Sequence, residues 1–518
     1  MARNRGGRAA RRRALAGDDG GASVLQQLDW QSLRYTDAPT EPLDPEGVEA
    51  IHDAAMRILE EIGIDFLHED ARRLLAEAGC KIDGDGPTVR MGRDFVMEQV
   101  AKAPGSFTIT PRNPERAVTL APGQGVFGSV ASAPNVSDLE NGRRTGTRAD
   151  FQTLLKLTQS FNCVHLHCGY PVEPVDVHAS VRHLDAIHDL LTLTDKAVHA
   201  YSLGRERIDD AMEMVRIAAG FDEEAFEAQP RMYTNINSSS PLKHDWPMLD
   251  GAMRLAERGQ AVIVAPFTLA GAMAPVTLAG AIAQQTAEAL AAIALLQWIR
   301  PGAPVVYGAF TSNVDMQSGA PAFGTPEYIR SMQISGQMAR YYGLPWRGSN
   351  ANASNFPDAQ AGWETSNSLY GVMSGQASIV FHAAGWLEGG LTASLEKFVI
   401  DCELLQQWTY YHNHPVPTTE ADLAVDAIRE VGPHGHFLGA EHTQARYKNA
   451  FYAPFLSDWR NYEAWEEAGA VKAHERATRI WKELVAAFEA PPMDEGIREQ
   501  LDDFVTRRKN EGGAPTDF

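Results

Sequence analysis

Two histidines separated by one residue, His165 and His167, form the clearest metal-binding pattern in the sequence. Residues i and i+2 share one face of a β-strand, so two imidazoles at this spacing can bind one metal ion. His199 could add a third ligand, as in a metal-dependent hydrolase, which would also need a carboxylate late in the chain. The alternative is a pair of buried, hydrogen-bonded structural histidines, and the sequence leaves both interpretations open.

Other residues that could do chemistry stand in less regular patterns. The pairs His412/His414 and His434/His436 lie in segments containing Pro and Gly, and we expect them at the surface or facing a partner. The glycine-rich stretches lack the spacing of a dinucleotide-binding or P-loop motif, and no GxSxG nucleophile motif is present. We therefore assign no covalent catalytic residue.

Eight short apolar segments recur along the chain, and a helical pattern follows each of them. Their spacing leaves room for one strand, one loop and one helix per unit. This repetition predicts an α/β fold, a (β/α)8 TIM barrel. The eight segments are Val126–Val130, Val164–Tyr170, Ala197–Leu203, Met232–Ser238, Ala261–Phe267, Val305–Phe310, Leu344–Asn350 and Ser378–Ala384.

The barrel is expected to span residues 121–417, between two α-helical extensions. Residues 45–120 carry apolar side chains at helical spacing, and residues 418–518 are mostly helical in pattern and highly charged. The first 16 residues contain six Arg and no acid, and no apolar stretch follows that could make a secretory signal. We predict that residues 1–44 form a basic, largely disordered tail.

Composition restricts the possible partners and compartment. The chain has 46 Lys and Arg against 67 Asp and Glu, a net charge of −21, which disfavours nucleic acid as a partner. Four cysteines without a dense framework indicate reduced thiols and a cytoplasmic protein. The uncharged run from Ala261 to Ala283 contains two prolines, so we interpret it as a strand, a loop and a helix start rather than a membrane span.

The stretch between residues 270 and 400 resembles the trimethylamine methyltransferase family of corrinoid-dependent enzymes. The resemblance rests on blocks that include LAGAMAPVTLAGAIAQQTAEALA from Leu269, PGAPVVYGAFTSNVDMQSGAPAFGTPE from Pro301 and FHAAGWLEGGLTASLEKFVID from Phe381. Founding members of this family use pyrrolysine, whereas this chain has only standard residues. It is therefore similar to the branch without pyrrolysine, whose characterised members act on quaternary amines such as glycine betaine.

The resemblance implies a methyl transfer from a small quaternary amine to the cob(I)alamin of a separate corrinoid protein. A quaternary ammonium leaves as a neutral tertiary amine, so no proton has to be delivered to it. The chain would then supply position and a dry site rather than a nucleophile. It implies no tightly bound cofactor in this chain. Barrels of this size often self-associate, and we expect a dimer or higher oligomer.

Catalytic residues of such barrels lie where strands end and the next loops begin. Aromatic rings there can hold a trimethylammonium group by cation–π contacts. The alternative for each ring is packing of a helix on the barrel. The candidates for substrate binding are Phe310, Phe356, Trp363 and Trp386, with Trp346 as a further aromatic in the same region.

His382 stands at the end of the eighth apolar segment, where it could donate a hydrogen bond to a substrate carboxylate. Glu388 follows in a Gly-rich loop and could orient His382 or face the cation. The alternative for His382 is a core histidine that is hydrogen-bonded to the backbone. The alternative for Glu388 is a solvated loop carboxylate.

Four polar residues after the seventh segment could line the barrel mouth and face a corrinoid. These are Asn350, Asn352, Asp358 and Gln360. Turn chemistry and a helix cap explain the same residue types equally well. Two further classes therefore stay open beside the methyltransferase: a hydrolase using His165 and His167, and a non-catalytic barrel that binds quaternary amines.

Overall fold

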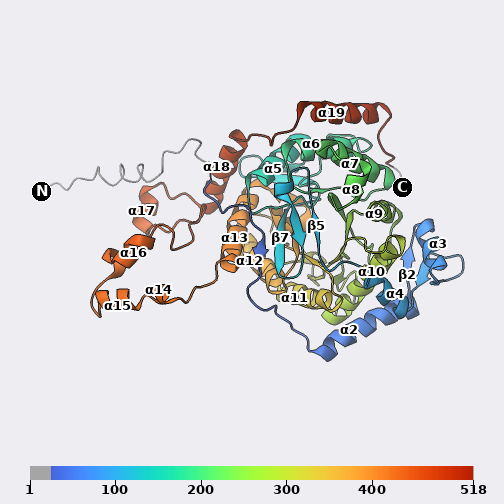
Figure 1. The fold of residues 1–518 in the computed structure, drawn as a ribbon, viewed down its shortest axis with the longest axis horizontal. Helices are drawn as coiled ribbons and strands as arrows, with labels where there is room; N and C mark the ends of the chain where they lie inside the picture. The colour runs from blue at the N-terminus through green and yellow to red at the C-terminus, as the bar shows by residue number, and fades with distance from the viewer. Residues whose placement is uncertain (1–24, 517–518) are drawn as a thin grey trace.

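The computed structural model describes residues 25–516 and has a curled sheet of parallel strands at its centre (Figure 1). Neighbouring strands follow the order β10, β11, β13, β15, β18, β19 and β7, and each pair runs parallel. The strands are β7 (Gln124–Ser129), β10 (Val198–His199), β11 (Met232–Ile236), β13 (Ala261–Val264), β15 (Val305–Gly308), β18 (Trp346–Ser349) and β19 (Ile379–Ala384).

The segment around Leu166 connects the two ends of this sheet. Leu166 forms parallel bridges with Gly128 of β7 and with Ala197 beside β10. The Ser129 amide donates to the Leu166 carbonyl at 3.1 Å, and the His167 amide donates to the Ala197 carbonyl at 3.2 Å. Seven of the eight predicted strand segments thus contain a regular strand of the sheet, and the second contributes a single bridged residue.

A helix follows each of the eight segments, as the helical patterns predicted. Most begin at a residue that caps the first turn, such as Thr147 before α5 or Thr325 before α11. The helices are α5 (Arg148–Ser160), α6 (Arg182–Leu193), α7 (Arg205–Ala219), α9 (Trp246–Glu257), α10 (Leu278–Ile299), α11 (Pro326–Tyr341), α12 (Ala359–Ser374) and α13 (Leu395–Asn413), with the short α8 (Glu223–Glu227) after α7.

The inside of the curled sheet has its own apolar core. Side chains from β7, β11, β13, β15 and β19 meet there, together with Leu166. The hairpin of β5 (Phe107–Ile109) and β6 (Val118–Leu120) contributes Ile109 and Leu120 to the same core. Since this hairpin precedes β7 and also bonds Pro230 just before β11, it covers the end of the sheet where the parallel strands begin. The loops that follow the strands cover the opposite end.

Residues 45–120 are not simply helical, so the predicted helical extension needs correction. Three helices, α2 (Pro45–Arg57), α3 (Glu69–Glu77) and α4 (Arg93–Val100), are joined by the five-residue π-helix η1 (Ile58–Ile62) and by strands. β2 (Ile64–Phe66), β3 (Lys81–Ile82) and β4 (Thr88–Arg90) form a small sheet with β12 (Lys243–His244). Two- and three-residue strands are too short for an alternating apolar pattern to reveal them.

Helix α10 is the one helix, within residues 25–516, that is long and apolar enough to cross a membrane. Of its most apolar stretch, 83% is buried inside the protein. It packs against α2, α3 and α4 on one side and against β13 and β15 on the other. A helix covered on both sides is apolar all round for reasons of packing alone.

The predicted disordered tail is wrong for its second half. Residues 1–24 lie outside the described residues, but residues 25–44 run along the sheet. Leu33 is fully buried in β1 (Leu33–Arg34), which pairs antiparallel with the start of β7. The Tyr35 hydroxyl donates to the Ala377 carbonyl at 2.8 Å. The buried apolar side chains of this segment, including Leu25 and Leu33, give it a reason to order.

The chain after the sheet is helical, as predicted. It contains α14 (Glu420–Leu423), α15 (Val425–Val431), α16 (Glu441–Arg446), α17 (Tyr462–Glu467), α18 (Ala473–Ala486) and α19 (Glu495–Asn510). α18 packs on α13, and α19 lies across α6 and α7 (Figure 1). Arg508 and Lys509 of α19 reach Asp210 and Asp185 at 2.6 Å each. The boundaries proposed for the domains stay predictions.

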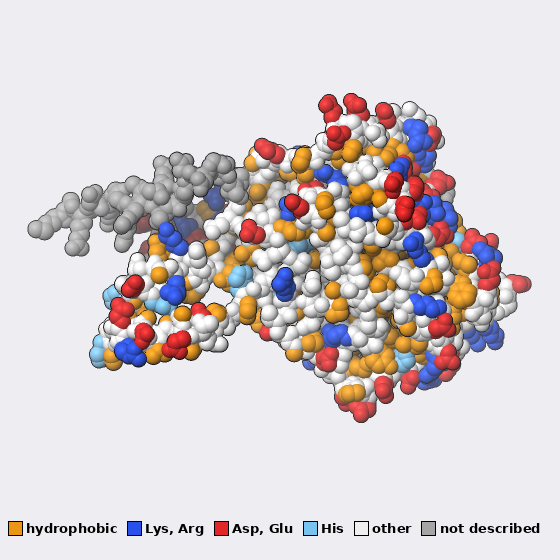
Figure 2. Space-filling model, viewed as in Figure 1, with side chains coloured by type: hydrophobic (Ala, Val, Ile, Leu, Met, Phe, Trp, Pro, Cys, Tyr) orange, Lys and Arg blue, Asp and Glu red, His pale blue; other side chains and the backbone are white. Residues whose placement is uncertain are grey.

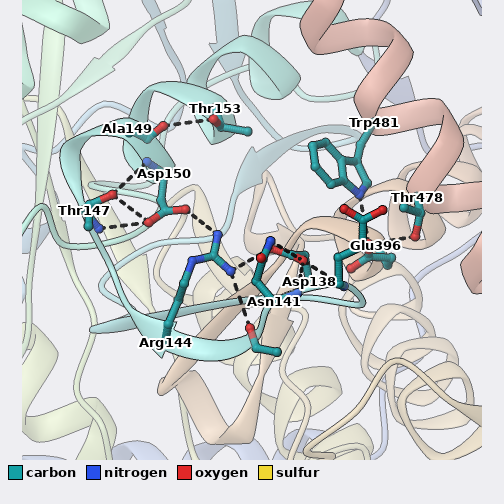
Figure 3. A network of polar contacts seen from close by, with 12 residues as sticks. Asp138, Asn141, Arg144, Thr147, Ala149, Asp150, Thr153, Glu396, Thr478 and Trp481 are labelled. Carbon is teal, nitrogen blue, oxygen red and sulfur yellow. Dashed lines mark hydrogen bonds and ion pairs between the residues drawn. The ribbon is translucent and has the colours of Figure 1, made fainter.

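Two small sheets stand at the end where the parallel strands finish. One joins β14 (Leu269–Ala270), β16 (Ser312–Val314) and β17 (Pro321–Ala322); the other joins β20 (Trp386–Leu387), β21 (Thr392–Ser394), β8 (Asn135–Asp138) and β9 (Gly142–Thr145). Arg144 of β9 holds the second sheet by ion pairs of 2.6 Å to Asp138 and Asp150 (Figure 3). Nearby, Glu396 of α13 accepts hydrogen bonds from Thr478 and Trp481 of α18.

A buried ion pair fixes the loop that follows β19. Lys397 and Asp401, one turn apart on α13, bind each other with almost no exposure to solvent. Asp401 also accepts from the Gly385 amide at 2.8 Å and from the Thr365 hydroxyl at 3.2 Å. Thr365 donates in turn to Asn352 at 3.0 Å. The pair therefore connects α13, α12 and the loops after β18 and β19.

We predict that Asp401→Asn lowers the free energy of unfolding by about 3–5 kcal/mol, because Lys397 is left buried without a negative partner. Urea unfolding at pH 7 measures the change. The matched control is Lys397→Met combined with Asp401→Asn, which removes both charges while an acceptor for the Gly385 amide remains. A double variant as unstable as the single one would show that the charge is not the cause.

Candidate functional site

Arg347 of β18 places a positive charge inside the curled sheet. Its side chain is 2% exposed, and its guanidinium lies 4.5 Å from the ring centre of Phe381 and 5.1 Å from that of Phe310. One nitrogen donates to the Ala309 carbonyl at 3.2 Å, while Nε has no hydrogen-bond partner within residues 25–516. Burial lowers the pKa of Arg347 to about 10, so it stays charged at neutral pH.

Within residues 25–516, no carboxylate forms an ion pair with Arg347. Groups that lie close enough to act on it electrostatically are Tyr328, Cys168 and Tyr233, which are neutral at pH 7. A buried charge is normally paired. Arg347 is therefore a candidate anion-binding group.

His382 lies directly beyond Arg347 because β19 is irregular. The pairing of β19 with β7 shifts register between Val380 and Ala384, and His382 adopts a left-handed φ of 54°. In a regular strand, Phe381 and His382 would point to opposite faces. Here the Phe381 ring faces Arg347, while the His382 ring meets both Phe381 and Phe310. A bulge is a common way to re-aim a side chain beside a functional site.

Aromatic rings surround His382. Its ring centre lies 3.9 Å from that of Trp386 and 5.8 Å from that of Phe310. Phe310 stacks on Phe323 at 5.6 Å and contacts Phe267 at 4.9 Å. Trp386 meets Phe310 edge to face at 6.0 Å. Four rings from the loops after β13, β15 and β19 therefore gather around Phe310, whose centre lies 5.1 Å from the buried guanidinium.

Buried polar atoms without a hydrogen-bond partner in the described chain concentrate at the same strand ends. Burial lowers the pKa of His382 well below its usual value and that of His199 to about 3, with Arg347 acting in the same direction. Both imidazoles are therefore neutral at pH 7.

Buried polar atoms without a hydrogen-bond partner mark a place where water or a ligand binds. They include Ser129 Oγ, His199 Nδ1, Asn235 Oδ1, Arg347 Nε, Ser349 Oγ, His382 Nδ1 and Trp386 Nε1.

Of the aromatic candidates from the sequence, Phe310 and Trp386 lie in this group and the other three do not. Phe356 is 48% exposed and contacts His474, and Trp363 on α12 is 57% exposed. Trp346 opens β18 rather than ending it, and its indole donates to the carbonyls of Gly375 and Gln376. The sequence could not separate the three because it does not show where each strand begins.

Glu388 does not contact His382. Its carboxylate forms an ion pair of 2.9 Å with Arg143 of β9, and its side chain is largely buried. The backbone amide of Glu388 donates to the Ser354 carbonyl at 2.9 Å. Glu388 therefore links the end of β20 to β9 at the other edge of the same small sheet.

The four polar residues after β18 separate into two kinds. Asn350 and Asn352 are fully buried, and the Asn350 amide donates to the Ala383 carbonyl at 3.0 Å, beside His382. Asp358 caps α12 by accepting from the Gln360 amide at 2.9 Å, and the Gln360 side chain donates to Glu364. Asn350 and Asn352 thus connect the ends of β18 and β19 by hydrogen bonds. Contact of any of the four residues with a corrinoid stays a prediction.

His165 and His167 face outward from the sheet, away from Leu166 and Cys168 in the inner core. Both ring nitrogens of His165 are used: Nδ1 accepts from the Phe127 amide at 3.0 Å and Nε2 lies 2.8 Å from the Gln31 carbonyl. His167 Nε2 lies 2.9 Å from the Thr194 hydroxyl. Residues 25–516 contain no group of three or more potential metal ligands. The geometry therefore favours the structural interpretation of this pair.

Arg347 is not among the residues that the sequence pattern indicates. It lies between Trp346 and Gly348 in Leu344–Asn350, a segment whose apolar character predicts a strand of the sheet and no functional residue. A charged residue inside an otherwise buried strand is itself a signal, because Arg is almost never fully buried without a partner. Phe267 and Phe323 were missed because they lie in loops whose course the sequence does not reveal.

A curled parallel sheet with unsatisfied polar groups and rings at its carboxyl ends is the arrangement of an enzyme that acts on a small molecule. The sequence matches the family described as "Trimethylamine methyltransferase (MTTB)" over residues 4–513. The chain belongs to this family and is an amine methyltransferase.

Several relatives cover almost all of the chain. The glycine betaine methyltransferase of Desulfitobacterium hafniense is 36% identical and aligns with 91% of this chain and 98% of its own length. The proline betaine:corrinoid methyltransferase of Eubacterium limosum is 27% identical over 88% of this chain and 96% of its own. The trimethylamine methyltransferase MttB of D. hafniense is 26% identical over 90% and 94%.

The buried histidines predict that the protein loses stability in mild acid. Burial lowers the pKa of His165 to about 4 and that of His167 to about 3, whereas an unfolded chain protonates histidine near pH 6.5. As the pH falls from about 6.5 towards 4, the unfolded state binds protons that the folded state does not. Each buried histidine then removes roughly 2 kcal/mol of stability at pH 5.

Urea unfolding of the wild type and of His167→Gln at pH 7 and pH 5 measures this contribution. We expect the difference between the two pH values to be about 2 kcal/mol smaller in the variant. His178→Gln, at an exposed position, is the matched control and should keep the wild-type difference. If His167→Gln also kept it, His167 would not be a source of the acid sensitivity.

Proposed function

We propose that this methyltransferase demethylates a small quaternary amine that carries a carboxylate, with glycine betaine as the leading candidate and proline betaine or carnitine behind it. The observation that carries the proposal is the buried, unpaired guanidinium of Arg347 next to the aromatic group of Phe310 and Trp386. The names of the betaine methyltransferases among its relatives support the same substrate class.

A betaine complements both halves of this site. Its carboxylate would pair with Arg347 and accept a hydrogen bond from neutral His382, which satisfies groups that are otherwise unpartnered. Its trimethylammonium would lie against Trp386 and Phe310, whose faces attract cations. Trimethylamine has no carboxylate and would leave Arg347 unpaired.

The reaction breaks a carbon–nitrogen bond. The methyl group passes to the cob(I)alamin of a corrinoid protein, and the bonding electron pair stays on nitrogen, which leaves as a neutral tertiary amine. Arg347 and His382 would fix the carboxylate so that one methyl group points out of the site. The apolar rings would exclude water, and no side chain has to give or take a proton.

The acceptor would approach the carboxyl ends of the strands. We infer that the Leu166 segment acts as the second strand of a closed (β/α)8 barrel, supported by its bridges to β7 and β10. Exposed apolar side chains occupy the loops at the carboxyl ends, namely Val276, Met316, Phe356 and Leu391, and Trp363 stands on the first turns of α12. They suit the docking of a corrinoid protein over the mouth. The four free cysteines agree with a cytoplasmic location.

Methyl transfer to a reduced corrinoid protein tests the activity directly. Purified enzyme is incubated with the corrinoid protein and with glycine betaine, proline betaine, carnitine, trimethylamine or tetramethylammonium, and the corrinoid absorbance is followed. We expect transfer from a betaine and little from trimethylamine or tetramethylammonium. Transfer from trimethylamine alone would contradict the role of the carboxylate, and no transfer from any amine would contradict the substrate class.

Arg347→Met tests how the substrate is recognised. A charge-assisted hydrogen bond contributes about 1.5–3 kcal/mol, so the affinity for glycine betaine should fall roughly tenfold to hundredfold. Tetramethylammonium, which has no carboxylate, should bind as weakly as before. Calorimetric titration measures both. The thermal midpoint of the ligand-free variant should stay level or rise, because an unpaired buried charge has been removed.

His382→Ala is the companion variant. This variant should also bind betaine more weakly than the wild type. The betaine affinity of Arg347→Lys should lie between those of the wild type and Arg347→Met. Equal losses for betaine and tetramethylammonium would show that these residues act through packing. Unchanged betaine affinity in Arg347→Met would place the carboxylate elsewhere.

A further inference from the structure

Residues 414–461 form an arm that stands away from the rest of the chain (Figures 1 and 2). The arm leaves after α13 and carries α14, α15 and α16 before it returns to the body at Tyr452 and Leu456, which reach Glu403 in the middle of α13. Its helices are four to seven residues long, too short to be stable by themselves.

The arm has almost no core of its own. Between residues 414 and 461, the buried side chains are those of Ala427, Ala440 and Leu456. Large apolar side chains point outward instead, with Leu438 77% and Phe451 85% exposed. Soluble proteins seldom expose a run of such side chains unless something covers it. The others include Val416, Ile428, Phe437 and Trp459.

A large aromatic groove lies at the root of the arm. It has a volume of about 1310 Å³ and is lined by Tyr370 of α12, Trp408 and Tyr411 of α13, and Trp459 in the segment by which the arm returns to the body. His412 lines it too, is 5% exposed, and has no hydrogen-bond partner for either ring nitrogen within residues 25–516.

We propose that this groove and the outer part of the arm, residues 437–451, bind each other between two copies of this chain. Within one chain α16 stands away from α12 and α13, whose side chains line the groove (Figure 1). A two-fold axis would let each arm fill the other copy's groove, the self-complementary contact of a symmetric dimer. The unpartnered ring of His412 then receives a partner from the other copy.

The amount and charge of the exposed surface fit a second copy. In residues 437–451, Phe437, Leu438, Tyr447 and Phe451 are 46 to 85% exposed, and a two-fold contact would bury them on both copies together with both grooves, as a stable interface of about 800 Å² per partner requires. Residues 420–451 contain three Lys and Arg and five Asp and Glu, a net charge of −2. A net charge of −2 on each arm leaves little repulsion between two copies at this contact.

The corrinoid protein of the proposed reaction does not suit this surface. Asn413 at the end of α13 bonds Ser32 and Arg34, next to β1, which pairs with Gln124 and Gly125 at the start of β7. The arm thus leaves from the end where the parallel strands begin. Arg347 and His382 serve the opposite end, where a methyl acceptor must approach.

Light scattering after size exclusion, over a concentration series, tests the proposal on the full chain. The wild type should have at least twice the chain mass of 56.6 kDa, and Leu438→Glu combined with Phe451→Glu should halve the mass observed for the wild type. Tyr411→Glu in the groove should do the same. Ile62→Glu, at an exposed apolar position on another part of the surface, is the matched control and should leave the mass unchanged.

Mixing the two variants gives the sharpest outcome. An arm variant keeps an intact groove and a groove variant keeps an intact arm, so the mixture should form a heterodimer through one of the two contacts. Circular dichroism and betaine titration check that each variant is folded. A monomeric wild type, an unchanged mass in the arm variant, or variants that do not pair when mixed would each overturn the proposal.

Loss of corrinoid-protein binding with an unchanged mass would overturn it as well, and would assign the arm to that partner. The mass measurement involves no amine, so failure of the proposed function leaves this test intact.

Discussion

The positive charge of Arg347 is the constraint around which the centre of this protein is organised. Burying a guanidinium without a carboxylate opposes folding, and the surroundings reduce this effect only partly, through two ring faces and one carbonyl. The remaining need for an anion is what would make the interior the binding site of the proposed betaine rather than a packed core. The neighbouring histidines stay neutral because Arg347 and burial act together on their pKa values.

The surroundings of Arg347 hold their shape through contacts made behind the site. The register shift in β19 turns Phe381 and His382 into the same space, and Asn350 supports the carbonyl of Ala383 beside them. The Lys397–Asp401 pair then fixes the Gly385 amide and, through Thr365, the loop after β18. In the proposed site, residues behind the rings of Phe310 and Trp386 would thus determine where those rings lie, which is how a site keeps its geometry on loops.

The sequence revealed the periodic parts of this structure and missed the irregular ones. Helical spacing predicted a helix after every apolar segment, and all eight are present. Alternation over two or three residues carries no signal, so β2, β3 and β4 were missed, and the second barrel segment forms only a bridge at Leu166. In the site, the strand-end rule led to His382, Phe310 and Trp386. It missed Arg347, which lies within β18 rather than at its end. It left open whether Asp358 lines the site or caps a helix, and the structure shows that Asp358 caps α12.

The division of the site into a strong anion anchor and a loose aromatic group suits methyl transfer from a betaine. In the transition state the positive charge on nitrogen disappears, so a tight cage for the cation would stabilise the substrate more than the transition state. The carboxylate keeps its charge throughout, and a contact with Arg347 would hold it equally in both. Four rings whose neighbouring centres lie 4.9 to 6.0 Å apart would bind a cation without enclosing it. Placing the affinity on the carboxylate therefore leaves the reacting end of the substrate free to lose its charge.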